Sequence, residues 1–158
     1  MKIVGIDSST KSTGLSFFMN DGLVFSTCID RKHIKDSDER IENMILALDK
    51  ELKAINPDAV FVEAQWMSRN PDTMKKLAYI VGAIMHICIE LNSGFNSTLP
   101  SQWRKELGIK GKNRQEDKEL AVQYVKEHYG KEVNDDEAEG ICIGEYGVKA
   151  MKIFEVEL

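Results

Sequence analysis

The sequence predicts one α/β domain built on a five-stranded mixed sheet, with three antiparallel strands followed by two parallel strands and helices on both faces. The order of apolar patterns supports this prediction: three strand-like segments come first, and helix-like and strand-like segments alternate after them. No internal repeat and no linker rich in Pro, Gly or Ser divides the 158 residues. We therefore expect a single domain over residues 1–158.

The first three strands are expected to form an antiparallel meander. Lys2–Asp7 has the apolar pattern of a buried strand and ends on an acid, and Thr13–Met19 is predicted as the second strand. The sequence Asn-Asp-Gly at 20–22 is typical of a tight turn, after which Leu23–Ile29 supplies the third strand.

The rest of the chain alternates between helices and strands. Apolar residues spaced three and four apart predict a helix over about 37–55, capped by Asp36 or Ser37. Ala59–Glu63 is a short apolar run, expected as a parallel strand that again ends on an acid. A helix over about 71–91 is apolar on most of its surface and is therefore expected to be central. The remaining elements are expected as a strand at 95–99 and helices at 100–107, about 115–127 and from 134 or 135 onward.

Bulk properties are those of an ordinary folded protein without a membrane span. The longest apolar stretch, Ala78–Ile89, is too short to cross a bilayer, and the first residues lack the apolar core of a signal peptide. Three cysteines without metal-type spacing indicate reduced thiols in a cytoplasmic protein. His86, inside the apolar helix, is expected to be a core residue, and no histidine is assigned to catalysis.

Acidic residues fall where the predicted elements would bring them together. Asp7 and Glu63 end parallel strands, whose carboxyl ends share one edge of a sheet. Asp136 and Glu139 lie three residues apart near the start of the last helix, so both project from one face. Each acid alone has an ordinary explanation as a strand-end or helix-start residue. Asp135 is an alternative to Asp136, which we favour because it is the one three residues from Glu139.

Such a cluster of carboxylates predicts a divalent metal site. Like charges raise one another's pKa, and a hard cation such as Mg²⁺ or Mn²⁺ removes that conflict. Two ions on either side of a phosphate activate the attacking water and stabilise the departing oxygen, so the cluster predicts phosphodiester hydrolysis with two ions per site. The net charge of −5 weakens a nucleic-acid interpretation without excluding it, because four carboxylates at one metal site supply most of that charge.

In several segments that run in family order over nearly its whole length, the chain resembles RuvC-type Holliday junction resolvases, particularly the shorter phage-like members. The matching segments are Ile3-Val4-Gly5-Ile6-Asp7, Ser12-Thr13-Gly14, Val62-Glu63, 70–82 and Asp136-Glu137-Ala138-Glu139-Gly140-Ile141-Cys142-Ile143-Gly144. The resemblance implies an RNase H-like fold and a metal-dependent endonuclease that cuts branched DNA, such as four-way junctions, in DNA recombination and repair. It also implies a 5′ phosphate product.

By the same resemblance, Asp7, Glu63, Asp136 and Glu139 would be the metal ligands. Many members of the family carry Asp at the position of Glu139, which puts the metal preference and the rate in question. A resolvase cuts two strands related by two-fold symmetry, so a homodimer with two equivalent sites is the economical design. The exposed part of the helix at 71–91 is the expected interface.

Basic residues are concentrated between Arg104 and Lys118, in a segment that Gly108 and Gly111 make flexible. A solvated loop is the ordinary interpretation of such a run, whereas beside a nuclease site contact with phosphates is favoured. The candidate DNA-binding residues are Arg104, Lys105, Lys110, Lys112, Arg114 and Lys118, together with Arg69, Lys75 and Lys76 near the start of the helix at 71–91. The resemblance places Lys118, as a catalytic residue, and Lys105 near the scissile phosphate.

Two tryptophans differ in what their positions indicate. Trp66 follows Glu63 in a loop, where it either packs in the core or stacks on an unpaired base, and both interpretations stay open. In RuvC-like proteins an aromatic residue at this place is thought to wedge the junction open, and Trp66 matches it. Trp103 lies on a short amphipathic helix and is expected to pack in the core.

Three other functions compete with junction cleavage. Actin-like and sugar-kinase ATPases share the predicted sheet, but they need a second lobe and glycine-rich adenosine contacts that this chain is too short to provide. An RNase H-type enzyme for RNA–DNA hybrids, or a flap or fork nuclease, would use the same fold and acids. A catalytically silent DNA-binding relative is the third, and the presence of all four acids argues against it.

Overall fold

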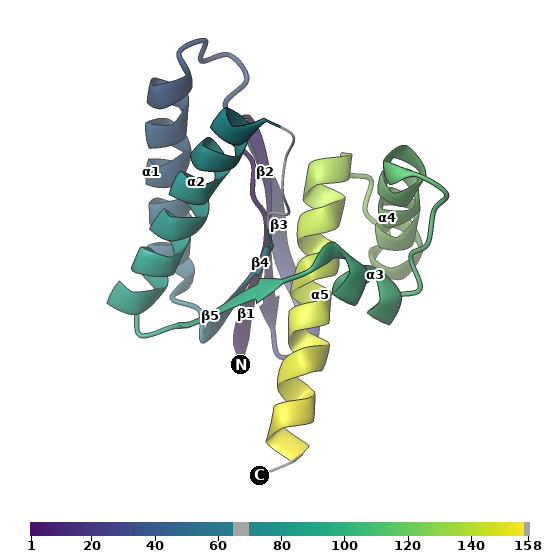
Figure 1. Cartoon of the computed structure of the whole chain (residues 1–158). Helices are drawn as coiled ribbons and strands as arrows, with labels where there is room; N and C mark the ends of the chain where they lie inside the picture. The colour runs from purple at the N-terminus through teal and green to yellow at the C-terminus, as the bar shows by residue number, and fades with distance from the viewer. Residues whose placement is uncertain (65–69, 157–158) are drawn as a thin grey trace.

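The structure is a computed structural model that describes residues 1–64 and 70–156. Its sheet has the strand order β3-β2-β1-β4-β5, with β1 in the centre (Figure 1). The strands are β1 (Lys2–Asp7), β2 (Ser12–Met19), β3 (Gly22–Asp30), β4 (Ala59–Glu63) and β5 (Gly94–Thr98). The five predicted strands are all present, and the predicted mixed sheet is confirmed.

β1 joins the antiparallel part of the sheet to the parallel part. Its antiparallel pairing with β2 sets Asp7 opposite Gly14. Its parallel pairing with β4 sets Ile6 beside Val62, and β4 is in turn parallel to β5. The carboxyl ends of β1 and β4 therefore lie at one edge of the sheet, where Asp7 and Glu63 end their strands as predicted.

Helices cover both faces of the sheet, α1 and α2 on one face and α3, α4 and α5 on the other (Figure 1). They are α1 (Ser37–Ile55), α2 (Pro71–Glu90), α3 (Pro100–Glu106), α4 (Arg114–Tyr129) and α5 (Asp135–Val156). Of the two candidate caps for α1, Asp36 is the one whose side chain accepts hydrogen bonds from the first turn. At the start of α5 the side chain of Asn134 accepts from the backbone N–H of Glu137 at 2.9 Å.

Each face of the sheet buries its own apolar core, because successive side chains of a strand point to opposite faces. On β1, Ile3 packs on the α5 side, whereas Val4 and Ile6 pack on the α1 and α2 side. The same alternation on β4 sends Phe61 toward α5 and Val60 toward α1 and α2. The sheet is thus covered by helices on both faces. The carboxyl ends of β1 and β4, where Asp7 and Glu63 lie, are outside these two cores.

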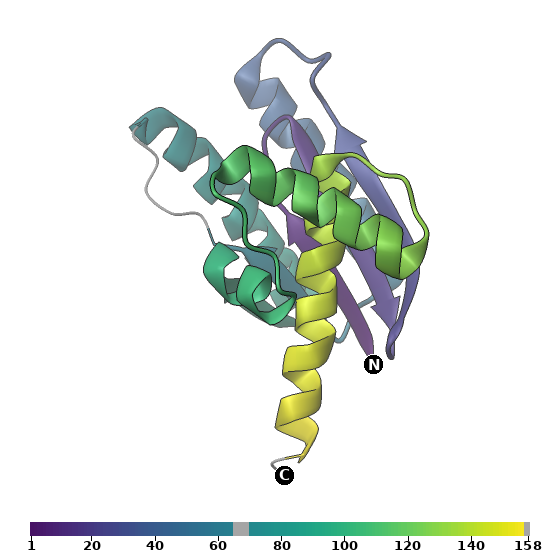
Figure 2. The same cartoon turned by 90° about the vertical axis from the view of Figure 1, so that its right-hand side faces the viewer.

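The central helix is α5, and the expectation that the helix at 71–91 would be central is wrong. Figure 2 shows α5 crossing the sheet, with α4 lying across α5 on the outside. α2 keeps an apolar surface outside the core, where Tyr79, Met85 and Ile89 are 45–70% exposed. The assignment of His86 to the core is also wrong, because it is exposed and lies 3.5 Å from Glu90. Among the described residues, no helix is both long and apolar enough to cross a lipid bilayer.

α5 approaches the sheet so closely that glycines are required at the contact. A Cβ on Gly5 would overlap the backbone of Gly144, and a Cβ on Gly14 would overlap the carbonyl oxygen of Asp136. The first turn of α5 therefore lies against the end of β1 and the start of β2. This contact is what places Asp136 beside Asp7.

Gly14→Ala is expected to destabilise the protein by about 3 kcal/mol, because the added methyl group meets backbone atoms that cannot rotate away. Denaturant unfolding measures the change. Gly22→Ala is the matched control, since the nearest atom to a Cβ placed there is 3.8 Å away. Equal losses of stability in the two variants would contradict this account of the α5 contact.

Candidate active site

The four acids singled out from the sequence meet in one pocket. Asp7 from β1, Glu63 from β4, and Asp136 and Glu139 from α5 line a hollow of about 450 Å³, which we call the acid pocket. The sheet supplies two of these side chains and the first turns of α5 supply the other two. The predicted convergence is present in the structure.

The acids of this pocket disturb one another's ionisation. Burial is the largest cause that holds the pKa of Asp7 well above its ordinary value. The carboxylates of Glu139, Glu63 and Asp136 raise it further, in that order, while Lys118 opposes them. Burial also raises the pKa of Glu63. Asp7 is therefore the acid on which the charges of the other three converge.

Two of the acids are held by neighbouring residues of α3. The indole Nε1 of Trp103 donates to Oε2 of Glu63 at 2.9 Å. The guanidinium of Arg104 donates to Oε1 of Glu139 at 3.2 Å and, through its other terminal nitrogen, to Asp117 at 3.2 Å. Glu139 is only 4% exposed, so this ion pair is the partner that a buried charge requires.

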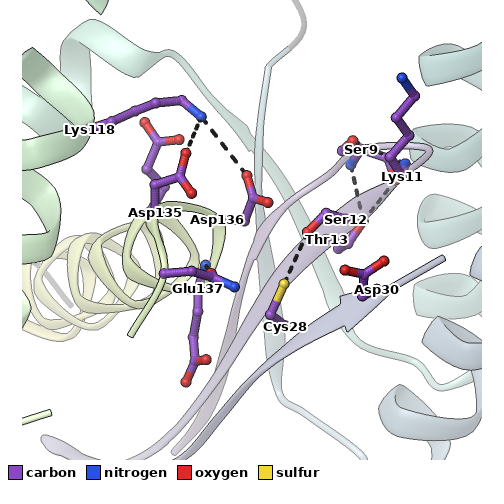
Figure 3. A network of polar contacts seen from close by, with 12 residues as sticks. Ser9, Lys11, Ser12, Thr13, Cys28, Asp30, Lys118, Asp135, Asp136 and Glu137 are labelled. Atoms are coloured by element: carbon purple, nitrogen blue, oxygen red, sulfur yellow. Dashed lines mark hydrogen bonds and ion pairs between the residues drawn. The ribbon is translucent and has the colours of Figure 1, made fainter. Parts of the chain in front are cut away.

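The three consecutive acids at the start of α5, Asp135, Asp136 and Glu137, have different partners. Asp136 lines the acid pocket and lies 4.0 Å from Lys118, which bonds Asp135 more closely (Figure 3). The hydrogen bond from Lys118 is the largest cause that lowers the pKa of Asp135. Glu137 points away from Lys118 (Figure 3). Its carboxylate accepts a hydrogen bond from the Ser26 hydroxyl at 2.7 Å. Of the two neighbouring aspartates, Asp136 is therefore the one that lines the acid pocket.

The donor set of the acid pocket fits a hard divalent cation, because all four side chains supply carboxylate oxygens. Within residues 1–64 and 70–156, however, no group of three or more His, Cys, Asp or Glu side chains is already drawn together in a way that would hold a metal ion. Like charges repel, which keeps the four carboxylates apart when no cation lies between them. A cation would have to draw the carboxylates together.

The predicted basic residues divide between three hollows. Lys118, Arg114 and Lys76 line the acid pocket itself. Arg104, Lys105 and Lys110 line a second hollow of about 500 Å³ between α3 and the loop that precedes α4, which we call the loop pocket. Lys75 lies with Lys76 in a third, between α1 and α2. Lys112 is exposed and lines none of these three.

Sequence reasoning missed two basic residues of the acid pocket. Lys11 lies in the turn between β1 and β2, and Arg40 lies in the first turns of α1; both line the pocket. Lys11 follows Asp7 by only four residues in a predicted hairpin, and that proximity was a usable signal. Nothing in the local sequence of Arg40 indicates that α1 begins beside the acids.

The aromatic predictions have different outcomes. Trp66 and Arg69 lie outside the described residues. The expectation that Trp103 packs in the core is confirmed, since its side chain is fully buried, but its bond to Glu63 was not foreseen. His33, His86 and His128 are all within the described ranges, and none of them lines the acid pocket.

A family model and named relatives match this chain over most of its length. The family model for crossover junction endodeoxyribonuclease RuvC matches residues 3–143. A protein of that name from a Nitratiruptor species is 28% identical over 128 residues, which cover 79% of this chain and 81% of that protein. Another from a Sulfurovum species is 29% identical over 119 residues, covering 73% and 75%. The resemblance inferred from the sequence is confirmed.

Solved structures share the fold. RuvC of T. thermophilus in complex with a Holliday junction substrate superposes with a TM-score of 0.78 at 19% identity, over 96% of each chain. The yeast mitochondrial Holliday junction resolvase gives 0.58 at 18% identity, over 99% of this chain and 84% of that one. These similarities confirm the predicted RNase H-like fold.

Asp7→Asn is expected to stabilise the protein at pH 7 in EDTA and so to raise its Tm, because it removes the buried charge. A carboxyl whose pKa is raised by folding binds its proton more tightly in the folded state. The ionisation of Asp7 therefore leaves the stability of the wild-type protein unchanged at pH values well below 3.8, the ordinary pKa of an aspartate. As the pH rises above that value, the ionisation lowers the stability.

Thermal unfolding of both proteins at pH 7 and near pH 3.5 tests this expectation. The stabilising effect of the substitution should be present at pH 7 and largely disappear near pH 3.5, where the aspartate is protonated in the folded state and mostly protonated in the unfolded state. An Asp7→Asn protein that is less stable than wild type at pH 7 would contradict the assigned charge conflict.

Proposed function

The chain belongs to the family of crossover junction endodeoxyribonuclease RuvC, and from this premise we propose that it is a metal-dependent endonuclease that cuts four-way DNA junctions by hydrolysing phosphodiesters. The observation that carries the proposal is the acid pocket, where four carboxylates from three elements face Arg114 and Lys118. Binding of DNA alone gives no reason to gather four acids in one hollow, because they repel phosphates.

Asp7, Glu63, Asp136 and Glu139 would hold the cation, with Mg²⁺ and Mn²⁺ as the candidates and two ions per site as the proposed number. A bound divalent ion supplies an activated water and stabilises negative charge on the leaving oxygen. Asp7 would be the central ligand of the site, because the other three acids all raise its pKa. Lys118 lines the acid pocket beside Asp136 and would offer its ammonium to the scissile phosphate.

The basic residues support a path for the DNA strand across the acid pocket. Lys118 and Arg114 lie within it, and Arg104 connects it to the loop pocket through its bonds to Glu139 and Asp117. Lys105 and Lys110 extend the path along the loop pocket. The exposed Lys112, two residues after Lys110, is a proposed contact beyond it. On the other side, Lys76 and Lys75 border the pocket at the start of α2. Arg69 and Trp66, in the segment between Glu63 and α2, remain proposed contacts of the junction.

A homodimer is proposed to pair through the exposed face of α2. Tyr79, Gly82, Met85 and Ile89 follow one another along this face at steps of three, three and four residues. A Cβ placed on Gly82 would meet no neighbouring residue within 4 Å. A glycine in the middle of a helix costs about 1 kcal/mol relative to alanine, so its use here favours close approach of another chain. The N-terminal turns of α2 line the acid pocket, so pairing along α2 would hold two pockets in a fixed relation.

Cleavage of a labelled four-way junction in Mg²⁺, Mn²⁺ or EDTA tests the proposal. The wild-type protein is expected to introduce paired nicks only when a divalent ion is present. Asp7→Asn is expected to keep junction affinity and reduce cleavage at least about 100-fold, because it removes one ligand charge from the centre of the acid pocket.

Linear duplex, flap, fork and RNA–DNA hybrid are the control substrates. Equal cleavage of flaps and forks would widen the activity to branched DNA in general, and preference for the hybrid would favour an RNase H-type enzyme. Junction binding without cleavage in either metal would overturn the catalytic proposal and leave a DNA-binding protein.

Ile89→Glu is expected to shift the dimer to monomer in sedimentation, because two like charges would face each other across the two-fold axis. Paired nicks should then give way to single nicks. Leu46→Glu is the matched control, since Leu46 on α1 is 68% exposed and Ile89 is 70% exposed. A dimer that persists in Ile89→Glu would exclude this face of α2.

A further inference from the structure

A fully buried tryptophan lies directly behind one wall of the acid pocket. Trp103 is the largest side chain of the described residues with no exposed surface, and it packs in the core shared with α4 and α5. An indole has one polar group, an N–H that can only donate. When the ring is buried, that group needs an acceptor, and here the acceptor is Oε2 of Glu63, at 2.9 Å.

Both ends of this hydrogen bond are anchored by backbone structure. Glu63 is the last residue of β4 and pairs with Thr98 on β5. α3 begins two residues after β5, and the side chain of Gln102 accepts from the backbone N–H of Leu99 at 2.8 Å, which secures the entry to the helix. The donor and the acceptor are therefore fixed to the same edge of the sheet by independent bonds.

Arg104 restrains the indole further. Its guanidinium lies over the Trp103 ring at 4.9 Å from the centroid while bonding Glu139 at 3.2 Å. The core covers the rest of the ring, so the ring is held on both sides and the direction of its N–H is set. Consecutive residues of one short helix thus hold acids from β4 and from α5.

We propose that Trp103 is a positioning residue for the cation site, whose indole N–H holds Oε2 of Glu63 and so leaves Oε1 for a divalent cation in the acid pocket. The inference rests on the proposed function only in requiring that a cation bind this pocket. A carboxylate on a flexible side chain loses rotational freedom when it becomes a ligand, and a preset orientation reduces that cost. The indole acts through Glu63 and touches no reacting atom.

Trp103→Phe separates the effect of the N–H donor from the effect of the buried ring. Phenylalanine keeps an aromatic side chain in the core and removes the donor. The Kd for Mn²⁺, measured by titration calorimetry without DNA, is expected to rise roughly 10-fold. Phe18→Leu is the matched control: Phe18 is also fully buried in the same core, and it has no hydrogen bond to an acid. It should lower stability and leave the Kd for Mn²⁺ unchanged.

A second measurement leaves the core untouched. The chain contains two tryptophans, so a ¹H–¹⁵N spectrum of the wild-type protein shows two indole signals, and the one absent from Trp103→Phe belongs to Trp103. Added Mg²⁺ should move the Trp103 signal saturably, because a ligand bound to Oε1 changes the charge on Oε2. The Glu63→Gln variant of the full chain should abolish that response.

Each outcome decides the proposal. A weaker Kd in Trp103→Phe together with a Mg²⁺-dependent indole signal supports it, and so does the indole response alone if the variant does not fold. An unchanged Kd in a folded variant, or an indole signal that ignores Mg²⁺, overturns it. A wild-type protein that binds Mn²⁺ through Glu63 but cuts no junction would sink the proposed function while leaving the role of Trp103 intact.

Discussion

The close contact between α5 and the first two strands is the constraint on which the rest of the molecule depends. Glycines at 5, 14, 140 and 144 allow backbone to meet backbone, and a Cβ at any of them would collide with an atom across the contact. The contact buries Ala138 and Ile141 in the core and at the same time brings Asp136 and Glu139 to the end of β1. Stability and site geometry therefore have a common origin.

The carboxylates of the acid pocket repel one another, and the neighbouring basic residues only partly offset this repulsion. Lys118 and Arg104 each bond one acid of the pocket region and one acid outside it, which disperses the charge without filling the space between the carboxylates. Trp103 adds a neutral donor where a further cation would compete with a metal ion. The raised pKa of Asp7 is the sign that this cost is not fully offset.

α2 illustrates how one helix is used twice. Its inner surface completes a core with α1 through Ile80, Ile84 and Ile87, while its first turns border the acid pocket. Its outer surface keeps large apolar side chains in solvent. A helix that is apolar on all sides either is buried within its own chain or packs on its own chain with one side and on a partner with the other. In the described fold, only the inner side of α2 is covered.

The sequence by itself determined the elements and the acids. Periods of two and of three to four residues, the Asn-Asp-Gly turn and the candidate caps are local, so the strands, the helices and the mixed character of the sheet were predictable. The strand ends placed Asp7 and Glu63 at one edge. Only the tertiary structure decided which helix is central, that His86 is exposed, and that Arg40 reaches the pocket. Trp103 and Glu63 are 40 residues apart, and Arg104 and Glu139 are 35 apart. No short-range pattern encodes such pairs, because they exist only once the packing of α3 against the sheet and α5 has set the side-chain directions.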